Sequence, residues 1–196
     1  MAFNKSQHPW LHIHRSKNIA RRYLITNGFD GALTMLGLMI GFYTSEDAPL
    51  SVAINACTGA AIALFMSGTS SAYLSETAER KKELRELEKA LLTDLTESDY
   101  GKASHYVPIF VALVNGLSPL LISMGIIAPL WLAQLGMVFP ISPFLIASLI
   151  ALTSIFFLGL FLSRVSKTFW LWAGLRTLAI AIATVLIILF FEGNLL

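Results

Sequence analysis

Long apolar stretches separated by short polar ones dominate this chain. A helix needs about 20 residues to cross a bilayer core of about 30 Å, and five of the apolar stretches are that long. They lie near residues 23–43, 50–74, 106–128, 141–163 and 170–191. The pattern therefore predicts an all-α, polytopic membrane protein with five transmembrane helices, in contact with a lipid bilayer.

The composition agrees with a membrane protein. Hydrophobic residues make up 56% of the chain and charged residues only 13%, whereas about a quarter of an average soluble domain is charged. The net charge of +2 is small and the basic residues lie beside apolar segments, so nucleic-acid binding is not expected. The single cysteine, Cys57, excludes a disulfide framework and a thiolate zinc site, and we interpret it as a small packing residue.

Basic residues occur in alternate connections between the apolar stretches. Lys and Arg precede the first stretch, follow the second at 80–102, and follow the fourth at Arg164 and Lys167. Because positively charged loops remain in the cytoplasm, we expect a cytoplasmic amino terminus and an external carboxyl terminus. The membrane would be the cell membrane of a prokaryote or a vacuole-like membrane of a eukaryote.

Residues 1–22 differ from the rest because they mix basic side chains with Trp and aliphatic ones. This mixture is typical of an amphipathic segment on the anionic inner leaflet, so we divide the chain into this cytoplasmic segment and a five-helix domain at 23–196. His8, His12 and His14 are possible metal ligands, but His12 and His14 would not share a helix face, and ligation is the less favoured interpretation.

Residues 75–100 contain strong helix formers and no Gly or Pro. We expect the second transmembrane helix to extend into the cytoplasm as an acidic helix over about these residues. Its glutamates fall within an arc of about 80°, and carboxylates suit Mn²⁺, Mg²⁺ or Ca²⁺ and tolerate Fe²⁺. The alternative is a solvated helix with Glu to Lys pairs. A neighbouring leucine stripe needs a partner, most simply a second protomer. The glutamates are Glu76, Glu79, Glu83 and Glu86, and the leucines are Leu84, Leu87, Leu91 and Leu95.

An acidic residue, Asp30, lies about two turns into the first apolar stretch. An ionised carboxylate in a membrane is costly unless water, a cation or a partner compensates it, so it indicates function. Asn27 and Thr34 share its helix face. The alternative interpretation is a structural Asp30 paired with Arg176 of the fifth stretch.

Further polar groups lie in the second and third stretches. Met66 offers a thioether that Fe²⁺ accepts, and Ser70 offers a hydroxyl, although such hydroxyls often bond to their own helix. Pro119 lacks an N–H and leaves the carbonyl of Asn115 without its helical partner, next to an amide side chain. This pair could attract a cation, and ordinary structural kinking is the alternative.

Four segments together resemble the vacuolar iron transporter family, from Arg21 onward. They are NGFDGALTMLGLMIG at 27–41, SGTSSAYLSETAERKKEL at 67–84, NGLSPLL at 115–121 and FLGLFLSRVSKTFWLWAGLRTLAI at 157–180. Two differences are visible. The family has an asparagine directly before the aspartate, whereas here Phe29 precedes Asp30 and Asn27 lies three residues upstream; and the cytoplasmic region is short.

The resemblance implies a homodimer that moves Fe²⁺, and often Mn²⁺, out of the cytosol in exchange for protons. It also implies that Asp30 matches the pore aspartate and that the glutamates match the start of a metal-binding region. We therefore expect a metal transporter with the ion as cargo and no prosthetic group. A membrane-anchored metal sensor or scaffold and an organic-solute transporter are alternatives. An enzyme is not expected, because the sequence has no visible nucleophile and base pair, hydrolytic metal triad or phosphate loop. The expected pathway residues are Asp30, Asn27, Thr34, Met66, Ser70 and Asn115, and the expected metal ligands are Glu76, Glu79, Glu83, Glu86 and Asp30.

Overall fold

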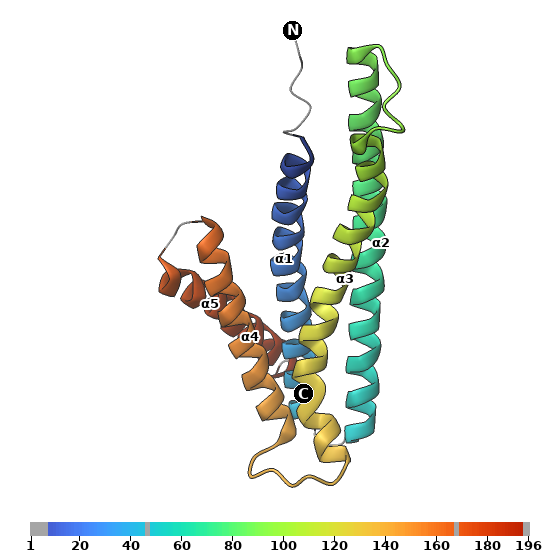
Figure 1. Cartoon of the computed structure of the whole chain (residues 1–196). Coiled ribbons are helices and arrows are strands. Elements are labelled where there is room, and N and C mark those ends of the chain that lie inside the picture. Colours follow the sequence, from blue (N-terminus) through green and yellow to red (C-terminus); the bar gives the residue numbers. More distant parts are fainter. Residues whose placement is uncertain (1–7, 46–47, 167–168, 194–196) are drawn as a thin grey trace.

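The protein is all-helical in the part of the chain that the structure describes. This computed structural model describes the backbone of residues 8–45, 48–166 and 169–193 and the side chains of 19–45, 48–164 and 169–191. It contains α1 (His8–Thr44), α2 (Leu50–Leu91), α3 (Asp99–Gln134), α4 (Pro143–Ser166) and α5 (Trp170–Gly193), and no strand in these ranges (Figure 1). Each helix contains a segment long and apolar enough to cross a membrane, which confirms the five predicted spans.

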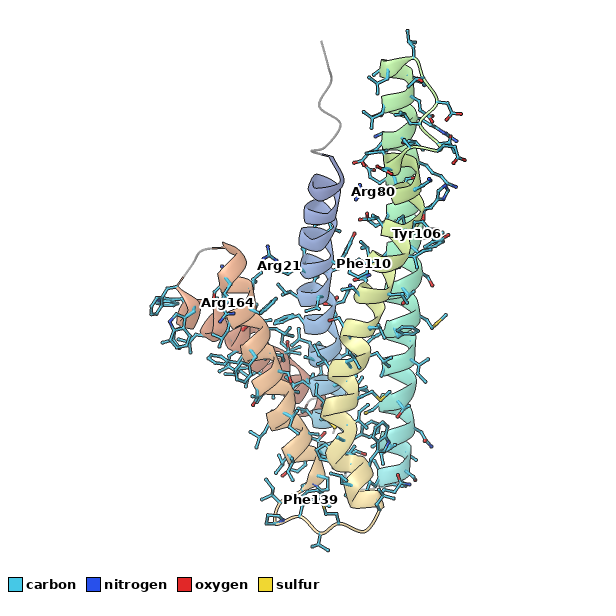
Figure 2. The ribbon with its side chains drawn as sticks, in the orientation of Figure 1. Arg21, Arg80, Tyr106, Phe110, Phe139 and Arg164 are labelled. Carbon is cyan, nitrogen blue, oxygen red and sulfur yellow. The ribbon has the colours of Figure 1, made fainter. Side chains whose placement is uncertain are left out.

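Two of the helices are much longer than a bilayer requires. At 1.5 Å per residue, the 42 residues of α2 span about 63 Å, roughly twice a bilayer core. α2 and α3 run antiparallel as a hairpin, and the tip of this hairpin lies beyond the start of α1 (Figure 1). The charged end of α2 leads into this projecting part, and Arg80 lies level with the first turns of α1 (Figure 2).

The acidic helix is shorter than predicted, because α2 ends at Leu91 and the chain reverses before α3. Leu92 adopts a left-handed backbone with φ 50° and terminates the helix. The Asp94 carboxylate then accepts hydrogen bonds from the backbone N–H and the hydroxyl of Thr96 at 2.8 and 2.6 Å. Ser98 caps the start of α3. Short polar side chains that bond their own backbone thus compete with the helix, and the prediction to residue 100 was wrong for this reason.

The apolar core lies among α1, α2, α3 and α4, toward the end of the molecule away from the hairpin tip. α1 packs between α3 and α4, and α5 packs mainly on α4. Cys57 of α2 is a fully buried free thiol, in agreement with its interpretation as a packing residue. The largest fully buried side chains are Met35, Leu36, Met39, Ile126, Ile127, Leu130 and Ile155.

The basic residues segregate toward one end of the bundle. Figure 2 shows Arg21, Arg80 and Arg164 toward one end and Phe139, in the uncharged connection between α3 and α4, at the other. The described aromatic residues Phe169 and Trp170 at the start of α5 are exposed. Exposed aromatic residues at a helix end are typical of the membrane interface.

Candidate functional site

The polar face of α1 points away from the rest of the protomer. Its opposite face carries Met35 and Met39, which are fully buried in the core. Asp30 and Thr34 are exposed and Asn27 is half-buried, so the three polar residues predicted to share a face do so on the outer side of α1. The helix periodicity that buries the methionines therefore turns the carboxylate outward.

The Asp30 carboxylate has no compensating group in the described part of the chain. The hydroxyl of Thr34 donates to the Asp30 backbone carbonyl at 2.7 Å, not to its carboxylate. Arg176, the alternative partner, is exposed on α5, and no ion pair joins it to Asp30 within the described ranges. A carboxylate on a membrane-spanning helix therefore needs water, a cation or another protein surface from outside the protomer.

Asn115 lies in the contact between α2 and α3. Its side chain is almost fully buried, and its amide nitrogen donates to the carbonyl of Gly68 at 2.7 Å. Its amide oxygen is buried without a hydrogen-bond partner among the described residues. The amide therefore faces α2, whereas Asp30 faces away from the core, and Asn115 connects two helices rather than joining the Asp30 face.

The segment around Pro119 brings α1, α2 and α3 into close contact. A Cβ on Gly31 of α1 would lie 2.8 Å from the Pro119 Cα, and the hydroxyl of Ser118 donates to a backbone carbonyl of α1 at 2.6 Å. The carbonyl of Asn115, which Pro119 leaves without its helical donor, would lie 3.3 Å from a Cβ on Gly68. The predicted cation-attracting carbonyl therefore packs against a glycine of α2.

Met66 and Ser70 lie on the outer surface of α2. Both are exposed, Met66 to 55%. α1 and α2 contact each other little, and the structure gives no hydrogen bond between these residues and Asp30 in the described ranges. One protomer thus carries Asp30, Met66 and Ser70 on its outside and does not bring them together around a central channel.

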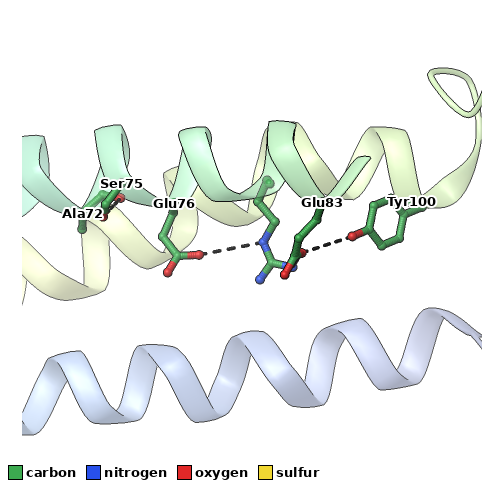
Figure 3. A network of polar contacts seen from close by, with 6 residues as sticks. Ala72, Ser75, Glu76, Glu83 and Tyr100 are labelled. Atoms are coloured by element: carbon green, nitrogen blue, oxygen red, sulfur yellow. Dashed lines mark hydrogen bonds and ion pairs between the residues drawn. The ribbon is translucent and has the colours of Figure 1, made fainter. Parts of the chain in front are cut away.

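A buried arginine separates two of the predicted metal ligands (Figure 3). The Arg80 side chain is only 8% exposed, its Nε lies 3.8 Å from Glu76 Oε2, and its Nη1 lies 3.2 Å from Glu83 Oε2. The hydroxyl of Tyr100 on α3 donates to the same Glu83 oxygen at 3.1 Å. Glu76 and Glu83 therefore belong to a polar network that links α2 to α3.

The other two predicted ligands, Glu79 and Glu86, are exposed on α2. The described residues contain no group of three His, Cys, Asp or Glu side chains placed to hold a metal ion. The side chains of His8, His12 and His14 lie outside the described residues. The predicted leucine stripe divides, because Leu84 and Leu95 are half-buried whereas Leu87 and Leu91 are exposed.

Sequence reasoning missed the role of Arg80 and Tyr100. Arg80 lies four residues after Glu76 and three before Glu83, which is the spacing of side chains that meet on one helix face. That spacing was a usable signal. Tyr100 offered none, because its contact depends on the reversal of the chain between α2 and α3.

The connection at the hairpin tip carries a second small polar network. Glu88 accepts a hydrogen bond from the Leu95 N–H at 3.2 Å. The hydrogen bonds from the Thr96 hydroxyl and N–H hold the pKa of Asp94 below its ordinary value of 3.8. These contacts stabilise the turn that positions Tyr100 beside Glu83.

The five helices, each long and apolar enough to cross a membrane, indicate a multi-pass integral membrane protein. The chain is 30% identical, over 174 residues, to an uncharacterized protein of the archaeon Methanocaldococcus jannaschii, and the match covers 87% of each chain. The chain belongs to the same family as that protein. No family model matches the chain, and no solved structure gives a significant match.

Proposed function

We propose that this protein transports divalent metal cations, Fe²⁺ or Mn²⁺, out of the cytosol in exchange for protons. The observation that carries the proposal is the Asp30 carboxylate, which lies on a membrane-spanning helix without a counter-charge in the described part of the chain. A carboxylate suits both steps, because a metal ion and a proton compete for the same oxygens. The resemblance of the Asp30 segment to the vacuolar iron transporter family supports the choice of ion.

The outward direction of Asp30 supports a pathway between two protomers. In lipid this carboxylate would be unpaired, and a homodimer whose α1 polar faces meet would place two such carboxylates where a divalent cation between them neutralises both. Asn27 and Thr34 would border the same pathway, and the exposed Met66 and Ser70 can reach it only from the outer surface of α2. Asn115 would act indirectly, by fixing α3 against α2.

The glutamates of α2 would collect cations at the entrance. With the amino terminus in the cytoplasm, the projecting part of α2 is cytoplasmic, and its carboxylates raise the local concentration of cations. Asp30 would then accept the ion inside the membrane and release it on the other side as a proton takes its place. Glu79 and Glu86 are the exposed members of this set, whereas Glu76 and Glu83 are tied to Arg80.

The test is metal flux in proteoliposomes with a pH gradient. Asp30→Asn keeps the shape of the side chain and removes its charge, so we expect Fe²⁺ and Mn²⁺ flux to fall to the background of empty liposomes while the dimer stays intact by size exclusion. Asp94→Asn is the matched control, since it removes an exposed carboxylate outside the span and should leave flux unchanged. Undiminished flux in the Asp30 variant would end the proposed role.

The same preparation separates the alternative functions. Metal binding without flux in the wild-type protein would support a sensor or scaffold. An organic-solute transporter predicts instead that Mn²⁺ leaves the thermal stability of the purified protein unchanged.

A further inference from the structure

We propose that Arg176 binds the phosphate of an anionic phospholipid on the lipid-facing side of α5. The lipid would lie in the leaflet at the start of α5, which is the side predicted to be cytoplasmic. The inference does not depend on metal transport, because it concerns a different charge of the membrane-spanning part.

Arg176 lies inside a membrane-spanning helix and faces away from the protein. The span begins at Trp170, so at 1.5 Å per residue Arg176 is about 9 Å from its start. The Arg176 side chain is exposed, whereas the neighbouring Gly174 and Thr177 are buried against α4. α5 lies at the edge of the bundle and packs on α4 and α1 in the described part of the chain (Figure 1). The guanidinium is therefore turned toward hydrocarbon, where it needs a counter-anion.

The protomer does not supply this counter-anion. The sequence has no Asp or Glu between Asp99 and Glu192, so the spans of α4 and α5 contain no acidic side chain. Glu192 belongs to the opposite end of α5. Asp30 of α1 is the remaining candidate, and no ion pair joins it to Arg176 within the described ranges. The anion therefore comes from outside the protomer.

The residues in line with Arg176 form a stripe with the polarity of a phospholipid. Residues four apart share a helix face, and Trp172, Arg176 and Ile180 have this spacing. Trp172 near the start of the span is 72% exposed, and Ile180 and Ile187, deeper in it, are 45% and 58% exposed. Tryptophan is typical of the headgroup level, and arginine binds phosphate through two parallel N–H donors. The stripe thus presents aromatic, cationic and aliphatic groups in the order of headgroup, phosphate and acyl chain.

A lipid phosphate suits this position better than a free phosphate. Exposed aliphatic side chains, Leu175 and Ile180, flank Arg176, so its surroundings exclude a hydrated ion and admit an amphiphile. The long side chain of arginine can bring its guanidinium toward the interface, where lipid phosphates lie. An anionic lipid is favoured over a zwitterionic one, because a zwitterionic headgroup carries its own cation beside the phosphate.

The experiment measures the melting temperature of the full-length protein in detergent during titrations with phosphatidylglycerol and, separately, phosphatidylcholine. We expect the wild type to reach half-maximal stabilisation at a lower concentration of phosphatidylglycerol than of phosphatidylcholine. Arg176→Gln removes the charge and should raise the half-saturating phosphatidylglycerol concentration about 5-fold, the size usual for one basic residue at an anionic membrane surface. Without lipid this variant should melt with the wild type, because Arg176 is exposed.

Arg85→Gln is the matched control, since it removes an exposed arginine from the charged end of α2 and should keep the wild-type response to phosphatidylglycerol. Equal half-saturating phosphatidylglycerol concentrations for Arg176→Gln and the wild type would overturn the inference. If the Arg176 variant does not melt cooperatively, native mass spectrometry counts the bound phosphatidylglycerol directly, and wild-type occupancy would overturn the inference equally.

Two further measurements separate the other sources of an anion. Inorganic phosphate should not stabilise the protein, and a stabilisation that requires Arg176 would show that a free ion binds there in place of a lipid. Size exclusion tests whether a second copy supplies the anion: loss of a dimer in Arg176→Gln, with an unchanged response to phosphatidylglycerol, would also overturn the inference.

Discussion

The two halves of the α2–α3 hairpin hold together in different ways. In the membrane-spanning half, Gly68 and Gly116 let the two backbones approach closely, and one side-chain hydrogen bond, from Asn115, crosses between them at this point. In the half toward the hairpin tip, long side chains meet instead, with Arg80 and Tyr100 both on the Glu83 carboxylate.

The difference follows from the surroundings of each half. In hydrocarbon a polar group cannot exchange its partner for water, so small residues and dispersion contacts hold the helices with few polar contacts. Near water, charged side chains are hydrated in the unfolded state, so an ion pair forms there only where its geometry offsets the loss of that hydration. One pair of helices is therefore held by close backbone packing in one half and by charged side chains in the other.

Close packing in the membrane half is tested by Gly116→Ala. A Cβ at Gly116 would overlap the Thr69 hydroxyl and lie 2.7 Å from the Phe65 carbonyl oxygen, so we expect a loss of about 2 kcal/mol in the free energy of unfolding. Gly59→Ala is the matched control, since nothing lies within 4 Å of a Cβ there and the change should cost little. Denaturation in mixed micelles measures both. Equal stability of the two variants would mean that the backbones are not in close contact.

The polar contribution in the same half is tested by Asn115→Ala. This variant removes the hydrogen bond to Gly68, for which about 1 kcal/mol is the expected size. Thr153→Val is the control, because the Thr153 hydroxyl bonds only within its own helix, to the Leu149 carbonyl, and its loss should have almost no effect. If the Asn115 variant transported metal at the wild-type rate per folded molecule, its proposed indirect role would be supported. Loss of flux without loss of stability would place it in the pathway.

The smallest effect is expected at the hairpin tip, from Asp94→Ala. Because the folded pKa of Asp94 is below its ordinary 3.8, the carboxylate contributes stability that is fully present above that value and is lost as the pH falls through the folded pKa. The melting temperature of the wild type should therefore exceed that of the variant at about pH 7 by a small margin attributable to the charge. This pH-dependent part of the margin should begin to fall near pH 3.8 and disappear once the pH is below the folded pKa. A difference in melting temperature that does not change with pH would mean that Asp94 acts through the geometry of the turn and not through its charge.

The sequence predicted some of the local structure correctly and some of it wrongly. The five spans follow from apolar length, and α4 and α5 begin and end close to the predicted positions. The predicted end of α2 is too late. Side chains of the Thr, Asp and Ser residues at 93–98 bond the backbone, and these bonds outweigh the helix propensity of the segment. The same residues, considered as turn formers, would have predicted the reversal.

The contacts of the candidate site also divide into those that the sequence predicts and those that it does not. The spacing of Glu76, Arg80 and Glu83 made their meeting on one helix face predictable, and the grouping of Asn27, Asp30 and Thr34 on one face of α1 was predicted. That Asn115 faces Gly68, and that Tyr100 reaches Glu83, depends on how α3 lies against α2, and residue spacing contains no information on this.

By itself the sequence determined that the chain crosses the membrane five times and carries a carboxylate within its first span, because span length and hydropathy are sums over neighbouring residues. Only the tertiary structure decided that Asp30 faces out of the protomer and that Tyr100 of α3 reaches Glu83 of α2. Helix periodicity fixes which residues share a face, whereas the packing of one helix on another fixes what that face meets.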